Sequence, residues 1–129
     1  MSLKIWHPGC VLVVDDEDPI RNMLKRFLEK KGYTVRTASN GEEAMKAIQE
    51  QKPVLVLLDV AMPGMNGIAV LDKIKALDSN IGVMMITGNT DDELARECMK
   101  RGAFDYIGKP FNFDYLENSV MAKILLLTS

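Results

Sequence analysis

The chain has 129 residues, the usual size of one domain, and its 16 basic and 18 acidic residues leave a net charge of −2. Its lysines and arginines are scattered, which argues against binding to a nucleic-acid backbone. No apolar stretch approaches the roughly 18 residues that span a bilayer, and the start lacks a signal-peptide hydrophobic region. We therefore expect one cytoplasmic domain over residues 1–129, without membrane or nucleic-acid partners. Residues 1–9 form a lead-in, and Trp6 and His7 within it receive no role.

Five segments along the chain have the patterns of β-strands. Residues 10–14, 54–58 and 81–86 are continuous apolar runs, which are typical of strands buried on both faces. Residues 33–38 and 104–107 alternate apolar and polar side chains, which predicts strands with one wet face at the two edges of a sheet.

Helical patterns separate these segments. The first begins at Asp18-Pro19, where we expect Asp18 to be the N-cap and the proline to be the first helical residue. The second and fourth open on the capping-box spacings Asn40–Glu43 and Thr90–Glu93. Further helices are expected at 67–77 and 112–127.

This alternation predicts an α/β fold, a doubly wound, flavodoxin-like parallel sheet of five strands with helices on both faces. The strand order 2-1-3-4-5 places the most apolar strands inside. Ligands bind such sheets beyond the carboxyl ends of the strands, where the order reverses, which here is between the first and third strands. The polar residues expected at this rim are Asp15, Asp16, Asp59, Thr87 and Lys109.

The carboxylates of Asp15, Asp16 and Asp59 predict a divalent-cation site. Two like charges about 4 Å apart repel by roughly 4 kcal/mol at an effective dielectric near 20, so the group stays ionised only beside a positive charge. A small set of oxygen ligands favours Mg²⁺, with Mn²⁺ as the other option.

The rim residues, together with other short motifs, resemble the signature of the receiver domain of two-component response regulators, a family that includes the chemotaxis regulator. The matching motifs, each following a separately predicted strand, are Asp15-Asp16, Asp59 with Met62-Pro63 and Gly67, Thr87-Gly88, and Lys109-Pro110-Phe111. The resemblance covers nearly the whole chain and carries the same strand order.

The resemblance implies that Asp59 accepts a phosphoryl group from a sensor histidine kinase. It also implies that Mg²⁺ is held by Asp16, Asp59 and the backbone carbonyl of Ala61, with Asp15 holding a metal-bound water. Lys109 and Thr87 would contact phosphoryl oxygens. Such a domain catalyses only its own phosphorylation and dephosphorylation and is not a turnover enzyme.

The resemblance further implies a conformational switch. Thr87 would move toward the phosphoryl group and Tyr106 would turn inward, which changes the surface of helix four, strand five and helix five. That surface would carry the output, as a homodimer interface or toward an effector. The Lys109-Pro110 bond resembles one that is cis in the family. The apolar helix ending near 127 leaves open either a continuation into an effector domain or contact with a second copy.

Two residues bear on how long the phosphoryl group persists. Ala61 offers no side chain to orient a hydrolytic water, whereas Asn89 does. We expect a lifetime that is not especially short.

Other interpretations remain open from the residues alone. Each rim residue singly fits an ordinary helix cap, turn or surface position, so only their combination carries weight. A phosphatase with an aspartyl nucleophile shares the nucleophile, Thr and Lys, but it needs a second aspartate where Ala61 stands. A flavodoxin-like module needs phosphate-binding donors after the first strand, where the chain has the acidic run 15–18.

Overall fold

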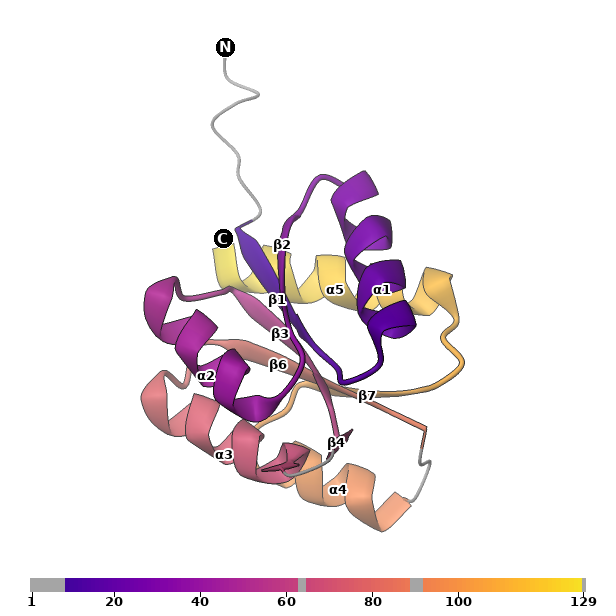
Figure 1. Cartoon of the computed structure of the whole chain (residues 1–129). Coiled ribbons are helices and arrows are strands. Elements are labelled where there is room, and N and C mark those ends of the chain that lie inside the picture. Colours follow the sequence, from indigo (N-terminus) through magenta and orange to yellow (C-terminus); the bar gives the residue numbers. More distant parts are fainter. Residues whose placement is uncertain (1–8, 63–64, 89–91, 129) are drawn as a thin grey trace.

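A five-stranded parallel sheet forms the centre of the molecule (Figure 1). The computed structural model describes residues 9–62, 65–88 and 92–128. The strands of the sheet lie in the order β2-β1-β3-β6-β7. Their bounds are Cys10–Val14 (β1), Thr34–Ala38 (β2), Leu55–Asp59 (β3), Gly82–Thr87 (β6) and Asp105–Gly108 (β7). This is the predicted order 2-1-3-4-5, and the predicted fold class is confirmed.

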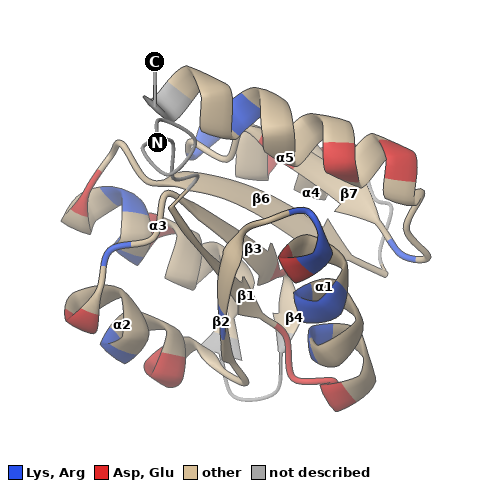
Figure 2. Ribbon diagram, turned by 90° about the horizontal axis from the view of Figure 1, so that it is seen from above, with Lys and Arg blue, Asp and Glu red and all other residues tan. Residues whose placement is uncertain are grey.

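Helices cover both faces of the sheet (Figure 1). Their bounds are Asp18–Lys30 (α1), Gly41–Glu50 (α2), Gly67–Leu77 (α3), Asp92–Lys100 (α4) and Phe113–Thr128 (α5). Helices α1 and α5 pack on one face, in a core that includes Leu24, Leu28 and Leu116. Helices α2, α3 and α4 cover the other face. Charged residues gather on the helices and loops around a largely uncharged sheet (Figure 2).

The predicted central and edge strands are confirmed. Strands β1, β3 and β6 are buried along their whole length, whereas β2 and β7 include partly exposed residues. Each strand after the first begins one residue later than predicted, and three of them also end one residue later. Asp59 and Thr87 are therefore the last residues of β3 and β6, because parallel pairing continues through them.

One structural element was not predicted. Strands β4 (Ala61–Met62) and β5 (Met65–Asn66) form a two-stranded antiparallel sheet directly after β3. Strands of two residues are too short to show an alternating pattern, so sequence periodicity does not reveal them. This small sheet connects Asp59 with the start of α3.

The prediction that Asp18 caps α1 is wrong. Asp18 is the first residue of the helix, and Glu17 occupies the N-cap position. The capping prediction for α2 is confirmed, because Asn40 accepts a hydrogen bond from the Glu43 N–H at 2.8 Å. Thr90 lies outside the described residues. Within the described ranges, no helix combines the length and apolar character needed to cross a membrane.

Candidate functional site

Two neighbouring strands bring the acidic residues together. Val14 of β1 and Leu58 of β3 are paired in register, so the residues that follow them lie side by side at the carboxyl edge of the sheet. Asp15 and Asp59 lie two positions after Val13 and Leu57, which belong to the core under α1 and α5. Because side chains alternate along a strand, both carboxylates are directed to that same face.

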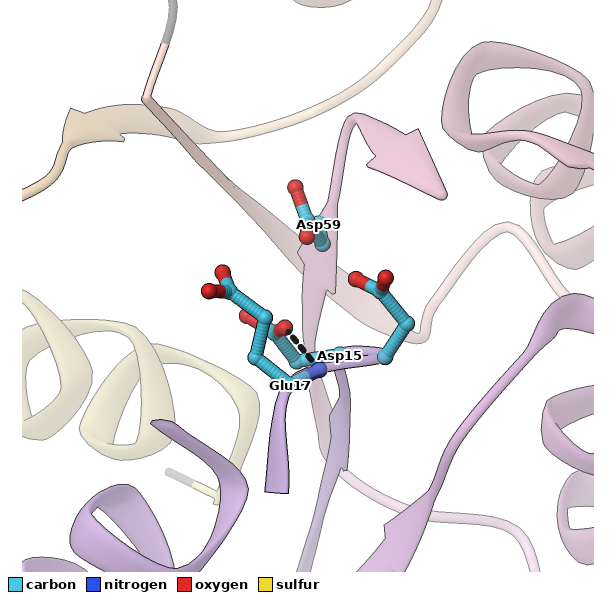
Figure 3. A group of neighbouring side chains, drawn as sticks. Asp15, Glu17 and Asp59 are labelled. Atoms are coloured by element: carbon cyan, nitrogen blue, oxygen red, sulfur yellow. Dashed lines mark hydrogen bonds between the residues drawn. The ribbon is translucent and has the colours of Figure 1, made fainter. Parts of the chain in front are cut away.

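Four carboxylates meet at this edge. Ligand oxygens of Asp15, Asp16, Glu17 and Asp59 all lie within 4.8 Å of one another. Figure 3 shows the side chains of Asp15, Glu17 and Asp59 converging from the end of β3 and the loop after β1. Asp15 and Asp59 are buried, with 0 % and 3 % of their surface exposed, whereas Asp16 and Glu17 are exposed.

The Asp15 carboxylate is held on both of its oxygens. Its Oδ1 accepts a hydrogen bond from the Glu17 N–H at 2.9 Å, drawn as the dashed line in Figure 3. Its Oδ2 lies 2.9 Å from the ammonium of Lys109. The Arg21 guanidinium donates to the backbone carbonyl of Asp15 at 2.6 Å. The loop after β1 is thus tied both to α1 and to the loop after β7.

Lys109 is the cation of the cluster. Its Nζ lies 2.9 Å from Asp15 Oδ2, 3.1 Å from Glu17 Oε1 and 3.5 Å from Asp59 Oδ2. Only 16 % of its side chain is exposed, so its contacts with the buried Asp15 and Asp59 are poorly screened by solvent. The backbone of Lys109 is fixed as well, because its N–H donates to the Thr87 carbonyl at 2.7 Å.

The surroundings of Asp59 make it a weaker acid than an ordinary aspartate. Burial and the nearby charge of Asp15 raise the pKa of Asp59 to about 6, against the lowering effects of Lys109 and of the Ala61 N–H. Burial lowers the pKa of Lys109, but its close contacts with the carboxylates of Asp15 and Glu17 outweigh burial and raise it. Lys109 therefore stays charged, while the metal-free Asp59 loses its proton at a higher pH than an ordinary aspartate.

The structure describes all but one of the remaining predicted residues. Thr87 is buried at the end of β6, the strand beside β3. Ala61 is exposed in β4, and its N–H donates to Asp59 Oδ1 at 3.2 Å. Tyr106, in β7, packs partly buried against the core under α2, α3 and α4. Asn89 lies outside the described residues. The Lys109–Pro110 peptide bond is cis.

Gly67 allows the start of α3 to approach the acidic strand. A Cβ at this position would stand 2.4 Å from the Asp59 carbonyl oxygen and 2.7 Å from the Val60 carbonyl oxygen. The Gly67 N–H donates to that Val60 oxygen at 2.8 Å. Only glycine permits this contact, which fixes the backbone just after Asp59.

Sequence reasoning missed the part played by Glu17. This residue belongs to the acidic run 15–18, but only folding brings its carboxylate to Lys109, a residue 92 positions away. The signal available in the sequence was its place before a helix, where glutamate is an unusual N-cap.

The donor set fits a small divalent cation. Carboxylate oxygens are the ligands that Mg²⁺ prefers, and it is commonly held by one or two carboxylates with water completing its coordination. The buried Asp15 Oδ2 also lacks a hydrogen bond of good geometry within the described structure, and Lys109 is its ionic contact. Asp15, Asp16 and Asp59 therefore suit a hard cation better than a soft metal.

The chain is a doubly wound α/β protein with an acidic site at the topological switch point of its parallel sheet. Comparison with known proteins narrows that class. The model of the response regulator receiver domain matches residues 11–121. The chain belongs to this family, and it is a signalling domain of two-component systems.

Individual relatives agree with this assignment. The chain is 36 % identical to sporulation initiation phosphotransferase F of Bacillus subtilis over 110 residues, which cover 85 % of this chain and 89 % of that protein. It is 41 % identical to the DNA-binding transcriptional regulator NtrC of Escherichia coli over 106 residues, 82 % of this chain and 23 % of that protein. The chain thus spans about a quarter of that longer regulator.

A solved structure shows the same fold. The crystal structure of the receiver domain of NtrX from Brucella abortus is 38 % identical, and the match covers 92 % of this chain and 99 % of that one, with a TM-score of 0.86.

Proposed function

We propose that Asp59 accepts a phosphoryl group from the phosphohistidine of a sensor histidine kinase in a Mg²⁺-dependent reaction. The observation that carries this proposal is the convergence of Asp15, Asp16 and Asp59 at one edge of the sheet, with Lys109 in contact with two of them. Asp59 is the acid that contacts the cation Lys109 through Oδ2 and accepts a hydrogen bond from the Ala61 N–H through Oδ1.

The transfer needs Asp59 as an anion. One of its oxygens forms a bond to phosphorus while the bond from phosphorus to the histidine nitrogen breaks, and the leaving imidazole keeps that electron pair and takes a proton. Asp16, Asp59 and the Ala61 carbonyl would hold Mg²⁺, with Asp15 holding a metal-bound water, and the bound cation would neutralise charge on the acids and on the phosphoryl oxygens. Lys109 would donate to one phosphoryl oxygen, and Thr87 to another.

Phosphorylation would also operate the switch. Thr87 is buried at the end of β6, and the next strand, β7, carries Tyr106 against the core beside α4. A Thr87 hydroxyl drawn toward the added phosphoryl group vacates space that Tyr106 fills. We propose that the surface of α4, β7 and α5 then changes and carries the output. Unchanged amide shifts in α4, β7 and α5 on binding beryllofluoride, a phosphoryl mimic, would contradict this.

The same surface is our proposal for a homodimer or effector contact. Met99 of α4 and Tyr115 of α5 are exposed large side chains on these elements. Light scattering with and without beryllofluoride tests the dimer, which should form or strengthen with the mimic bound. A molar mass that stays that of one chain at high concentration in both conditions would rule it out.

Two further features belong to the proposal. Because Ala61 has no polar side chain, we expect a phosphoryl lifetime that is not especially short, and a half-life of seconds without a partner phosphatase would contradict it. The chain is proposed to act in the cytoplasm and not as a turnover enzyme. Continuous release of phosphate from a small phosphate ester would point instead to a phosphatase.

The central experiment is incubation with acetyl phosphate and Mg²⁺, followed by intact mass measurement. We expect an added mass of one phosphoryl group in the wild type and none in Asp59→Ala. A matched Asp16→Asn variant should slow the reaction strongly, since it removes one proposed metal ligand. A phosphoryl group retained by the Asp59→Ala variant would remove Asp59 from its proposed role.

A further inference from the structure

Helix α1 begins with an N-cap residue that does not cap it. Glu17 occupies the position, but its side chain makes no capping hydrogen bond. Serine, threonine, aspartate and asparagine are preferred there because their short side chains reach the free N–H groups of the first turn. The Glu17 carboxylate instead contacts the Lys109 ammonium at 3.1 Å. Glu17 is thus an unfavourable N-cap for α1, and its side chain forms an ion pair with Lys109 instead.

Both ends of this ion pair have fixed backbones. The Glu17 N–H donates to Asp15 Oδ1 at 2.9 Å, and its carbonyl accepts from the Arg21 N–H at 3.0 Å. Lys109 donates its backbone N–H to Thr87 at 2.7 Å. Surface ion pairs usually contribute little because two mobile side chains must be ordered. Here that ordering cost is smaller, although Glu17 itself is exposed.

The ammonium of Lys109 donates hydrogen bonds to Glu17 and Asp59 and makes an ionic contact with Asp15. An ammonium has three N–H groups, and three carboxylates surround this one. The two shorter contacts, at 2.9 Å to Asp15 and 3.1 Å to Glu17, fix the position of Nζ. The third and longest, at 3.5 Å, is to Asp59 Oδ2.

We propose that Glu17 is a positioning residue for Lys109. Together with the ionic contact to Asp15, it holds the ammonium so that one N–H stays directed at Asp59 Oδ2. This inference rests on the proposed phosphorylation of Asp59. When Asp59 carries a phosphoryl group, the N–H directed at Asp59 passes to a phosphoryl oxygen, while the hydrogen bond from Lys109 to Glu17 is kept. Glu17 itself does not touch the phosphoryl group.

The negative charge of Glu17 and its positioning of Lys109 should change the phosphorylation rate in opposite directions, so the two effects can be measured separately. The negative charge of Glu17 repels an anionic phosphodonor, and its removal alone should speed the reaction. Loss of positioning should slow it. Glu17→Gln removes the charge but keeps an oxygen acceptor at the same reach. Glu17→Ser removes the charge, is too short to reach Lys109, and supplies a better helix cap.

The first experiment compares phosphorylation rates with saturating acetyl phosphate and Mg²⁺, together with melting temperatures. We expect Glu17→Ser to react several-fold more slowly than Glu17→Gln although it melts at the same or a higher temperature. Equal rates in the two variants would overturn the proposal. Glu50→Gln, at the far end of α2, is the control for loss of a remote charge and should react at the wild-type rate.

The second experiment needs neither metal nor phosphodonor. In EDTA, slow proton exchange should keep the ¹H–¹⁵N signal of the Lys109 ammonium visible in the wild type and in Glu17→Gln, whereas the signal should broaden or vanish in Glu17→Ser. An unchanged signal in Glu17→Ser would contradict the proposal.

A third measurement repeats the rate comparison with Lys109→Met. Because Glu17 acts through Lys109, the difference between the Ser and Gln variants should disappear in that background, and a persisting difference would refute positioning. Failure of the wild type to gain phosphate would count against the proposed function. A normal wild type with equal Ser and Gln variants would count against Glu17 alone.

Discussion

The surroundings of Asp59 disfavour the negative charge of its side chain. It is 3 % exposed and lies near the buried Asp15, whereas Lys109 and the Ala61 N–H favour its ionised form. A nucleophile kept reactive in this way lowers the stability of the folded chain. At the scale of single residues, we therefore expect substitutions of Asp59 and Lys109 to change the folding stability as well as the reactivity of the site.

Asp59→Asn should stabilise the metal-free protein at neutral pH. The folded-state pKa of about 6 lies above the unfolded value, so the wild type loses stability as pH rises from about 4 to about 6 and stays lower above that range. A shift of that size corresponds to roughly 3 kcal/mol at most. Urea unfolding in EDTA at pH 7.5 and pH 4 should show a gain at the higher pH that is absent at the lower. A gain of equal size at both would refute the charge explanation.

Lys109→Met should have the opposite effect. It leaves the buried carboxylate of Asp15 without its cation, and removing one partner of a buried pair costs about 3 to 5 kcal/mol when the pair is fully enclosed. Since 16 % of the Lys109 side chain is exposed, we expect a loss of about 2 kcal/mol in EDTA at pH 7.5. The cost should shrink in an Asp59→Asn background, where one negative charge is absent. Equal costs in both backgrounds would show that Asp59 and Lys109 are not coupled.

Among the secondary-structure elements, α3 has the closest relation to the acidic strand. Its first residue, Gly67, touches the carbonyl of Asp59, and the N-cap Asn66 accepts from the Ile68 N–H at 2.8 Å. The small sheet β4–β5 closes the short connection between β3 and this helix. The direction of the Asp59 backbone is thus set by how α3 begins.

Gly67→Ala should destabilise the protein. Alanine is the better helix former by up to about 1 kcal/mol, but its methyl group would press on backbone at 2.4 Å and overpacking costs about 1 to 3 kcal/mol. The clash should win, with a lower melting temperature and slower phosphorylation. Gly88→Ala is the matched control for stability, because a Cβ there meets no described atom within 4 Å. A Gly67→Ala variant as stable as the wild type would contradict this close contact.

For the whole molecule, the acidic rim links folding to cation binding. Carboxylates from separate elements meet only in the folded chain, so a cation that binds them stabilises the fold by mass action, about 2.7 kcal/mol at 100 times its dissociation constant. Mg²⁺ should therefore raise the melting temperature of the wild type, and by much less that of Asp15→Asn. The same rise in both proteins at equal ionic strength would place the effect outside this cluster.

The strand patterns and the rim residues could be predicted from the sequence alone. Continuous apolar runs predict strands buried on both faces, and β1, β3 and β6 have that burial. Asp15, Asp59 and Lys109 each come within two residues after a predicted strand, and they do meet. These predictions succeed because residue periodicity and parallel topology together fix which ends of the chain segments share an edge.

Tertiary structure alone decided which groups touch within that edge. The cap of α1, the small sheet β4–β5, and the pairing of Glu17 with Lys109 depend on how α1, β7 and α3 pack around the end of the sheet. Hydrophobic periodicity indicates which residues face the core. An ion pair between residues 92 positions apart depends instead on distances that the packing of the elements sets. The amino-acid order thus determined the fold and the residues of its rim, and the packing determined which partner each charge meets.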